Sequence, residues 1–302
     1  MKEKGGSNTF FYSPENIVPI RSLVLRAKCI VEGLIAGYHR SPYHGFSSEV
    51  LEYRPYRFGE PARCIDWRKY AKTERTVVRL FEDETNLYAR ILLDKSASMQ
   101  FYSSGSMSKF DYARTLAAAL AQILIRQRDA VGIEIFDENI KTSIPPRSTN
   151  IQLNTILAEL EHIVPEKHTN CGSVINTIAR KVKKRGLCII ISDFFDTPES
   201  IIKSLRHLRF KRQEIIILWI LDPLELDFSK DSKLKIKDVE TQEELILDGN
   251  TASHFYEIGF KSHRKKIEDA CRELMVDCSI VTTDAPFQKA LIQILEKRRK
   301  MF

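Results

Sequence analysis

The chain has 302 residues, of which 43% are hydrophobic and 29% are charged, a balance typical of a folded globular protein and not of a disordered one. Its apolar runs are no longer than a strand, so we expect no membrane-spanning helix, and its N-terminus lacks the apolar core of a secretion signal. The net charge of +7 is compatible with an anionic partner, but stacking aromatic residues do not interleave the basic runs. Nucleic-acid binding through basic helix ends is therefore the weaker interpretation of the charge.

The six cysteines are scattered along the chain, and no two of them form a Cys-x-x-Cys pair. This distribution predicts neither a disulfide framework nor a zinc site, and it fits a reducing compartment. The histidines are equally dispersed and show no His-x-x-x-His spacing. We therefore expect a cytoplasmic protein without a cysteine- or histidine-based metal site.

The first 87 residues show one helical pattern, over 20–36, and two strand-like stretches, over 46–56 and 76–84. These elements do not share the regular alternation that follows them along the chain. We therefore predict that residues 1–87 form an N-terminal region of one helix and a small β-rich part, separate from a domain of residues 88–302.

From Tyr88 onward, apolar strands alternate with amphipathic helices. The predicted strands span 88–94, 130–137, 138–144, 187–193, 214–222 and 276–284, and the predicted helices span 110–129, 148–163, 173–185, 198–210, 254–274 and 286–300. Strands that are nearly continuous apolar runs are covered by helices on both faces, and the strand at 138–144 follows its predecessor too closely to be parallel to it. We predict an α/β fold with a doubly wound, mostly parallel sheet, one antiparallel strand and a hairpin insertion at about 223–250.

The stretch LLDKSASM places the carboxylate of Asp94 and the hydroxyls of Ser96 and Ser98 directly after a buried strand. These residue types are also common in turns and helix caps, so their placement carries the argument. In doubly wound sheets, ligands bind beyond the carboxyl ends of the strands, where Asp193 ends a second strand and Thr169 lies in a further loop. Hard divalent cations prefer oxygen ligands, so we predict a site for Mg²⁺, Mn²⁺ or Ca²⁺.

Catalysis by such an ion would require a general base or a second metal ion beside it. Asp196 is the nearby carboxylate that fits the first role, and the sequence contains neither a Gly-x-Ser-x-Gly elbow nor a phosphate-binding loop. We expect no enzymatic activity. A metal-dependent phosphoester hydrolase is kept as the alternative, beside the nucleic-acid-binding protein.

Several separated motifs, over roughly residues 20–300, resemble known families. The DKSASM stretch, the Thr169 loop and Asp193 resemble the metal-ion-dependent adhesion site of von Willebrand factor A domains. Residues 37–84 resemble the signature region of the bacterial domain-of-unknown-function 58 family, which typically reads Gly-Asp-Asp-x-Arg-x-Ile-Asp-Trp where this chain has GEPARCIDW. The matching positions are Arg63, Ile65, Asp66 and Trp67, whereas Glu60 and Pro61 replace the usual acidic pair. The LDPLEL, ETQEEL and TTDAPF stretches are also similar to that family.

The resemblance implies a von Willebrand factor A-like domain that acts as a metal-dependent docking surface. Relatives of this kind are thought to be adaptors or cofactors of MoxR-type AAA+ ATPases in chaperone-like assembly. The implied ligands of the cation are Asp94, Ser96, Ser98, Thr169 and Asp193, and an acidic side chain of a protein partner would fill the open position. The family's glycines before the loop threonine are replaced by Lys167 and His168, so Ser173 stays an alternative to Thr169.

The GEPARCIDW stretch also has an interpretation that involves only packing. Trp67 is expected to anchor the core of the small region, and Arg63 and Asp66, three positions apart, are expected to form an ion pair. In that case, truncation of Trp67 would destabilise the protein by about 3 kcal/mol or more. A partner-facing role for these residues is the alternative.

Overall fold

A computed structural model describes residues 13–38, 52–57, 65–80, 87–103, 107–166, 169–226, 234–237, 244–247 and 249–299. The chain divides into two compact units, one made of Met1–Arg40 with Leu87–Phe302 and the other of Ser41–Asn86. This division differs from the expected N-terminal region of residues 1–87, because its helix belongs to the larger unit. Helix α2 (Leu23–Tyr38) buries one face against helix α4 (Lys109–Arg126), and that contact places it in the main core.

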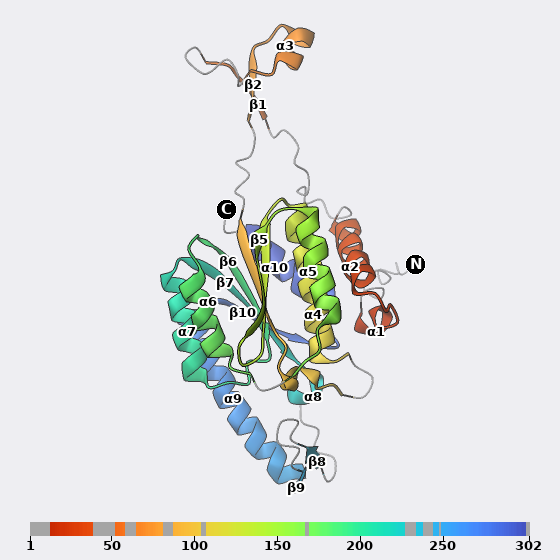
Figure 1. Cartoon of the computed structure of the whole chain (residues 1–302), viewed down its shortest axis with the longest axis vertical. Helices are drawn as coiled ribbons and strands as arrows, with labels where there is room; N and C mark the ends of the chain where they lie inside the picture. The colour runs from red at the N-terminus through yellow and green to blue at the C-terminus, as the bar shows by residue number, and fades with distance from the viewer. Residues whose placement is uncertain are drawn as a thin grey trace, which may run out of the picture. The chain divides into compact units, whose positions relative to one another are not determined.

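A six-stranded sheet forms the centre of the larger unit (Figure 1). Its strands are β3 (Tyr88–Asp94), β4 (Ala130–Phe136), β5 (Ile140–Arg147), β6 (Gly186–Ser192), β7 (Gln213–Leu221) and β10 (Asp277–Thr282). Their order is β10-β7-β6-β3-β4-β5, and all neighbours are parallel except β4 and β5. The predicted doubly wound sheet with one antiparallel strand is thus confirmed. The chain order reverses between β3 and β6, which makes this pair the switch point of the sheet.

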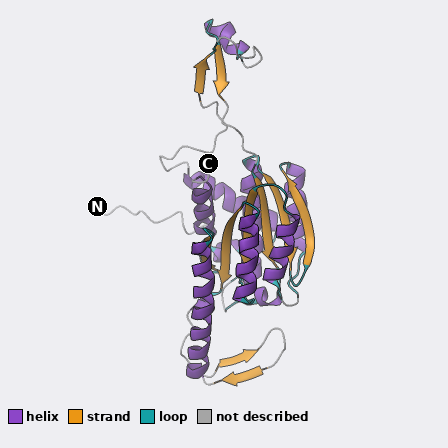
Figure 2. Ribbon diagram, turned by 90° about the vertical axis from the view of Figure 1, so that its left-hand side faces the viewer, coloured by secondary structure: helices purple, strands orange, loops and turns teal. Residues whose placement is uncertain are grey.

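Helices cover both faces of this sheet, as Figures 1 and 2 show. One face carries α2, α4, α5 (Asn150–His162) and α10 (Phe287–Arg299), and the other carries α6 (Cys171–Lys181), α7 (Pro198–Phe210) and α9 (Gly249–Glu273). Successive side chains of a strand point to opposite faces, so Ile91 and Leu93 enter the first core and Leu92 enters the second. The central strands are therefore mostly apolar, and the charged pair Arg90 of β3 and Glu134 of β4 forms a salt bridge at 3.0 Å.

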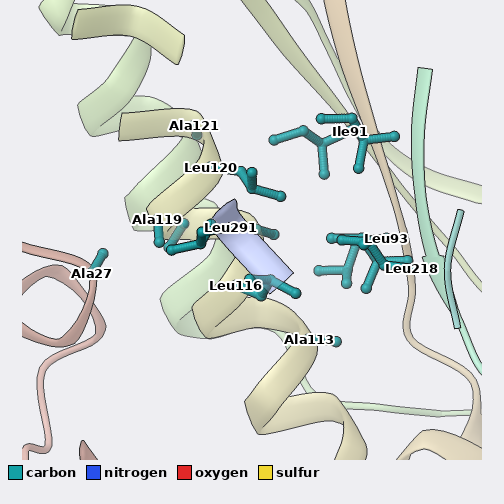
Figure 3. Packing of buried hydrophobic residues seen from close by; sticks show 14 of the residues in the cluster. Ala27, Ile91, Leu93, Ala113, Leu116, Ala119, Leu120, Ala121, Leu218 and Leu291 are labelled. Carbon is teal, nitrogen blue, oxygen red and sulfur yellow. The ribbon is translucent and has the colours of Figure 1, made fainter. Parts of the chain in front are cut away.

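Helix α4 lies between the sheet and α2 and is buried along almost its whole length. Figure 3 shows its Leu116 and Leu120 packed toward Ile91 and Leu93 of β3. Burial of each such leucine contributes about 2 kcal/mol. The hydroxyl of Ser108 accepts the N–H of Asp111 and caps the helix, so the first residue inside it is Lys109.

Two helix boundaries differ from the predicted ones. Helix α6 ends at Lys181 and not at Arg185, and strand β6 begins at Gly186, one position before the predicted start. A Cβ atom on Gly186 would lie 2.1 Å from the carbonyl oxygen of Tyr88, so the close approach of β6 to β3 requires glycine there. Helix α9 begins at Gly249, five positions before the predicted start.

The predicted hairpin insertion is present as an antiparallel pair of short strands. These are β8 (Leu234–Lys237) and β9 (Glu244–Leu247), and the short helix α8 (Pro223–Leu226) directly follows β7. Two further short helices, α1 (Pro14–Ile17) and the 3-10 helix η3 (Ala97–Gln100), complete the larger unit. In the part of the chain that the structure describes, no helix has the length and apolarity needed to cross a bilayer.

The smaller unit contains an antiparallel pair, β1 (Glu52–Pro55) and β2 (Val77–Leu80), and a helix that the sequence patterns did not reveal, α3 (Trp67–Thr73). The carboxylate of Asp66 accepts the backbone N–H groups of Arg68 and Lys69, each at 3.1 Å, and thereby caps α3. Asp66 is therefore a structural residue.

The expectation that Trp67 anchors a core is wrong. Its side chain is 56% exposed, and it makes an edge-to-face contact with Tyr70, which is 41% exposed. Trp67 is the first residue of α3 and shares a face of this helix with Tyr70, three positions later. No residue of α3 is buried, so this face does not form part of a core. Arg63, the expected partner of Asp66, lies outside the described residues.

Candidate metal centre

The two predicted carboxylate ligands lie at the switch point of the sheet. Asp94 is the last residue of β3, and Asp193 directly follows the neighbouring parallel strand β6, which pairs with β3 through Leu93 and Ile191. Because the strands are parallel and in register, both carboxylates leave the sheet at the same edge. Both residues are fully buried, at 0% exposure.

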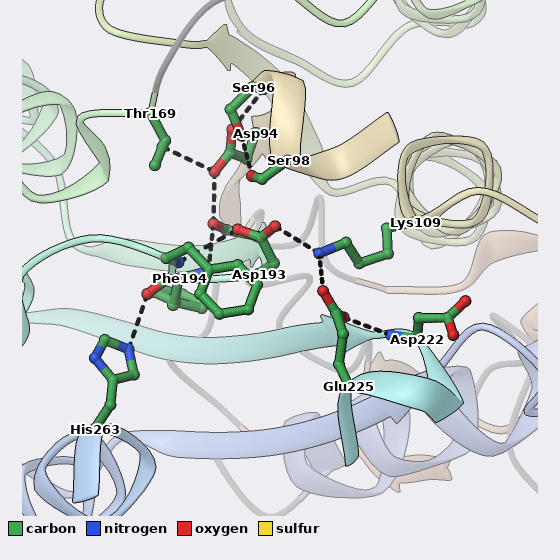
Figure 4. A network of polar contacts seen from close by, with 12 residues as sticks. Asp94, Ser96, Ser98, Lys109, Thr169, Asp193, Phe194, Asp222, Glu225 and His263 are labelled. Carbon is green, nitrogen blue, oxygen red and sulfur yellow. Dashed lines mark hydrogen bonds and ion pairs between the residues drawn. The ribbon is translucent and has the colours of Figure 1, made fainter. Parts of the chain in front are cut away.

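Hydroxyl and amide donors surround the carboxylate of Asp94 (Figure 4). Its Oδ1 accepts the backbone N–H of Ser96 at 2.8 Å, and its Oδ2 accepts the hydroxyls of Thr169 at 3.1 Å and Ser192 at 2.6 Å. The hydroxyls of Ser96 and Ser98 lie 3.1 Å apart. This arrangement follows from the loop, because Ser96 is the cap of η3 and Ser98 lies in its first turn. Asp94 and the hydroxyl residues Ser96, Ser98 and Thr169 are thus brought together by hydrogen bonds, and Asp193 leaves the sheet beside them.

Burial raises the pKa of Asp94 to about 6, and the nearby Asp193 carboxylate adds to this effect. Hydrogen bonds from Ser192 and Ser96 oppose it. Two buried carboxylates that repel each other are stabilised by a cation placed between them and the hydroxyls. The donors are carboxylate and hydroxyl oxygens, which fits a hard cation such as Mg²⁺ or Mn²⁺. Among the described residues, no group of three or more His, Cys, Asp or Glu side chains is placed to hold a metal ion, so a cation here would depend on hydroxyl ligands beside the two carboxylates.

Thr169, and not Ser173, is the loop residue whose hydroxyl contacts Asp94. Ser173 is exposed, and its backbone N–H is bonded to the side chain of Asn170, the cap of α6. The N-terminus of α6 is held by Asp196, whose Oδ2 accepts the N–H of Gly172 at 2.9 Å. This bond fixes the loop that carries Thr169.

Gly172 allows α6 to approach α7 closely. A Cβ atom at this position would lie 2.1 Å from the hydroxyl oxygen of Ser200 and 2.7 Å from its backbone carbonyl carbon.

The candidate general base Asp196 accepts backbone N–H groups from Gly172 and Thr197, so each of its carboxylate oxygens accepts one backbone hydrogen bond. Its contacts are those of a residue that positions loops.

Lys95, the second residue of the DKSAS motif, points away from the Asp94 carboxylate toward the rim of the site. Its ammonium donates to the carbonyl of Val164 and lies 3.5 Å from the carboxylate of Asp137. Lys141 lies 3.5 Å from the same carboxylate. Asp137 thus neutralises the charges of Lys95 and Lys141, and it is not among the residues that contact Asp94.

Sequence patterns did not indicate three residues of the site: Ser192, Lys109 and Glu225. Lys109 is fully buried, and its ammonium donates to Asp193 Oδ2 at 2.8 Å and to Glu225 Oε1 at 2.7 Å. A lysine one position after a helix cap is normally solvated, so no local pattern indicates this burial. Glu225 lies in the family-like LDPLEL stretch, which was the available signal for it.

The family model described as protein of unknown function DUF58 matches residues 52–266. Uncharacterized proteins of Mycobacterium bovis and Mycobacterium tuberculosis are 24% identical over 292 residues, which cover 95% of this chain and 91% of theirs.

Solved structures that are similar to this chain include two of low identity. The conserved hypothetical protein BatB from Bacteroides thetaiotaomicron is 19% identical, with a TM-score of 0.49 and coverage of 71% of this chain and 99% of that chain. The SpRpn10 VWA domain is 12% identical, with a TM-score of 0.41 and coverage of 68% and 94%. The family model spans more than half of the sequence, including the Asp94 and Asp193 loops, and the chain therefore belongs to the DUF58 family.

Proposed function

We propose that this chain is a protein-interaction module whose docking site is a divalent cation. The ligands from the chain would be Asp94, Ser96, Ser98, Thr169 and Asp193. The observation that carries the proposal is the convergence of two buried carboxylates and three hydroxyls at the switch point of a doubly wound sheet. Oxygen-only donors with few charges leave a bound Mg²⁺ able to accept a further anionic ligand.

The burial of the ligands indicates from which side a partner would reach the ion. Asp94, Ser96 and Asp193 are buried, whereas Ser98 and Thr169 are only partly buried. The open coordination position would therefore lie on the side of Ser98 and Thr169. An aspartate or glutamate of a protein partner has the oxygen ligand and the negative charge that this position requires.

Binding rather than hydrolysis is supported by the contacts of the nearby acids. Asp196 holds backbone N–H groups with both of its oxygens, and Asp137 is paired with lysines. His263 bonds through Nε2 to the carbonyl oxygen of Phe194, on the far side of Asp193. A base that activates water needs a lone pair directed at the substrate. The contacts that these three side chains make with backbone groups and lysines support a non-enzymatic role.

The family resemblance narrows the partner to be tested first. We propose that the partner is a MoxR-type AAA+ ATPase and that this chain acts as its adaptor or cofactor in chaperone-like assembly. Such an ATPase would place an acidic side chain at the cation, and loss of the cation would release it.

Two measurements test this function. Calorimetric titration with Mg²⁺ and Mn²⁺ should show binding to the wild type and none to Asp94→Asn. Capture of a purified MoxR-type ATPase should then require both wild-type Asp94 and the cation, and EDTA should abolish it. The matched control is Glu166→Gln, which removes a 65% exposed acid at the rim without touching a proposed ligand.

Equal capture with Mg²⁺, with EDTA and by Asp94→Asn would refute metal-dependent docking. The enzymatic alternative is tested with generic phosphate esters. Mg²⁺-dependent turnover that disappears in Asp196→Ala would overturn the non-enzymatic assignment.

A further inference from the structure

The ammonium group of Lys109 is a buried cation inside the proposed metal centre. Figure 4 shows it between the carboxylates of Asp193 and Glu225, to which it donates at 2.8 Å and 2.7 Å. It also lies 4.9 Å from the centre of the Phe195 ring. Burial alone would lower the pKa of Lys109, but the two carboxylates more than offset burial and raise it. The group is therefore charged throughout the physiological range of pH.

This cation occupies one oxygen of a proposed metal ligand. Asp193 Oδ2 accepts Lys109, while its Oδ1 accepts the backbone N–H of Phe195 at 3.3 Å. A divalent cation held by Asp193 would share that carboxylate with the ammonium. Because Lys109 and Asp193 are fully buried, the two positive charges repel each other more strongly than they would in water, and the ammonium weakens the attraction of the site for the metal.

Glu225 competes with Asp193 for the same ammonium. Its second oxygen, Oε2, accepts the backbone N–H of Asp222 at 2.8 Å, and the side chain of Asp222 caps α8 through the N–H of Leu224. Glu225 is thus held in place at the end of β7, directly before the segment that leads to the β8–β9 hairpin. The negative charge of Glu225 offsets part of the positive charge of the ammonium and so reduces the effect of Lys109 on Asp193.

We propose that Lys109 is a positioning residue that sets the cation affinity of the metal centre. As a built-in counter-charge on Asp193, it keeps the divalent cation weakly bound until the carboxylate of a partner adds its negative charge. Glu225 adjusts this effect through Lys109. The inference rests on the proposed metal-dependent docking function.

Substitutions of Lys109 and of Glu225 should change the cation affinity in opposite directions. This result distinguishes the inference from a merely structural role. Lys109→Met removes the counter-charge and should tighten Mn²⁺ and Mg²⁺ binding by about tenfold or more. Glu225→Gln leaves the ammonium to Asp193 alone and should weaken binding several-fold. If these residues only supported the fold, both substitutions would weaken binding together.

The experiment measures Mn²⁺ affinity by electron paramagnetic resonance and Mg²⁺ affinity by calorimetry, on the full chain without a partner. Lys109→Met leaves two buried carboxylates without their cation, so Lys109→Gln, which keeps a hydrogen-bond donor, and the double variant Lys109→Met/Glu225→Gln are measured with it. Circular dichroism confirms that each variant is folded. In the double variant, Glu225→Gln should change the affinity less than it does in the wild type, because Glu225 acts through Lys109.

The inference is overturned if folded Lys109 variants bind the cation with unchanged or lower affinity. It is also overturned if Glu225→Gln has the same effect with and without Lys109. Cation binding by the wild type that Asp94→Asn abolishes, together with unchanged affinity in the Lys109 variants, would remove this inference and leave the proposed function. Absence of cation binding in the wild type and in every Lys109 variant would overturn both.

Discussion

The hydroxyl of Ser192 donates a 2.6 Å hydrogen bond to Oδ2 of Asp94 and so joins the ends of strands β6 and β3. The same oxygen of Ser192 accepts the backbone N–H of Phe194 at 3.0 Å. Ser192 therefore connects the two loops that carry the buried carboxylates. It is a supporting residue, distinct from the serines of the DKSAS motif.

Ser192→Ala is expected to destabilise the metal-free protein by about 2 kcal/mol, because it leaves a buried carboxylate oxygen and a buried N–H without this partner. Chemical denaturation near neutral pH measures the change. Ser204→Ala is the comparison, since Ser204 is buried but bonds only to the carbonyl of Ile201 in its own helix. A loss below about 0.5 kcal/mol for Ser192→Ala would contradict the supporting role.

Asp94→Asn should abolish cation binding and should remove a pH dependence of stability that the metal-free wild type shows. The pKa of Asp94 is raised from 3.8 to about 6, so folding favours its protonated form. That contribution is complete below the ordinary pKa and is lost as pH rises from about 4 through about 6. The rise of the Asp94 pKa from 3.8 to about 6 corresponds to a loss of stability of about 3 kcal/mol by neutral pH. The neutral amide of the variant does not titrate and so does not show this loss.

The measurement is the free energy of unfolding in EDTA as a function of pH. The difference between wild type and Asp94→Asn isolates this carboxyl from the other titrating groups. It should grow in favour of the variant over the window from about 4 to 6 and level off above it. A difference that is constant across this window would show that the pKa of Asp94 is not raised.

Thr169→Ala and Ser173→Ala decide which hydroxyl completes the site. Thr169 donates to Asp94 at 3.1 Å, whereas Ser173 is exposed on α6. Thr169→Ala should therefore weaken Mg²⁺ affinity about tenfold, and Ser173→Ala should leave it unchanged. Calorimetric titration of both variants checks this, and the reverse result would assign the ligand to Ser173.

Gly172→Ala should destabilise the protein by about 1–3 kcal/mol, because the new methyl group overlaps the backbone of Ser200. The shift needed to relieve this overlap would also disturb the bond from Gly172 to Asp196, which holds the Thr169 loop. Mg²⁺ affinity should fall with stability. Thermal unfolding and calorimetry measure the two effects, and a fully stable Gly172→Ala variant would contradict the close approach of α6 and α7.

Trp67→Ala should cost less than about 1 kcal/mol, because the side chain is 56% exposed. Asp66→Ala should cost about 1 kcal/mol, since it removes the cap of α3. Amide hydrogen exchange of Tyr70, whose N–H bonds to the carbonyl of Asp66, reports on this helix directly. Protection that is lost in Trp67→Ala but kept in Asp66→Ala would reverse the roles assigned here.

The sequence alone determined the sheet and one side of the site. Strands that are nearly continuous runs of apolar residues predicted the covered, mostly parallel sheet, and the short connection after Asp137 predicted its antiparallel strand. Asp94, Ser96 and Ser98 belong to one loop, so their proximity is a local property. Local patterns of this kind depend on backbone geometry and side-chain periodicity within a few residues.

Only the tertiary structure decided the remaining contacts. Lys109 is 84 positions from Asp193 and 116 from Glu225, and its burial depends on β6 and β7 ending beside the start of α4. Likewise, the assignment of α2 to the main unit and the exposure of Trp67 depend on which surfaces face each other. A charged side chain in a buried site is stable only when distant partners meet it, and that meeting is a property of the assembled sheet and not of any local stretch.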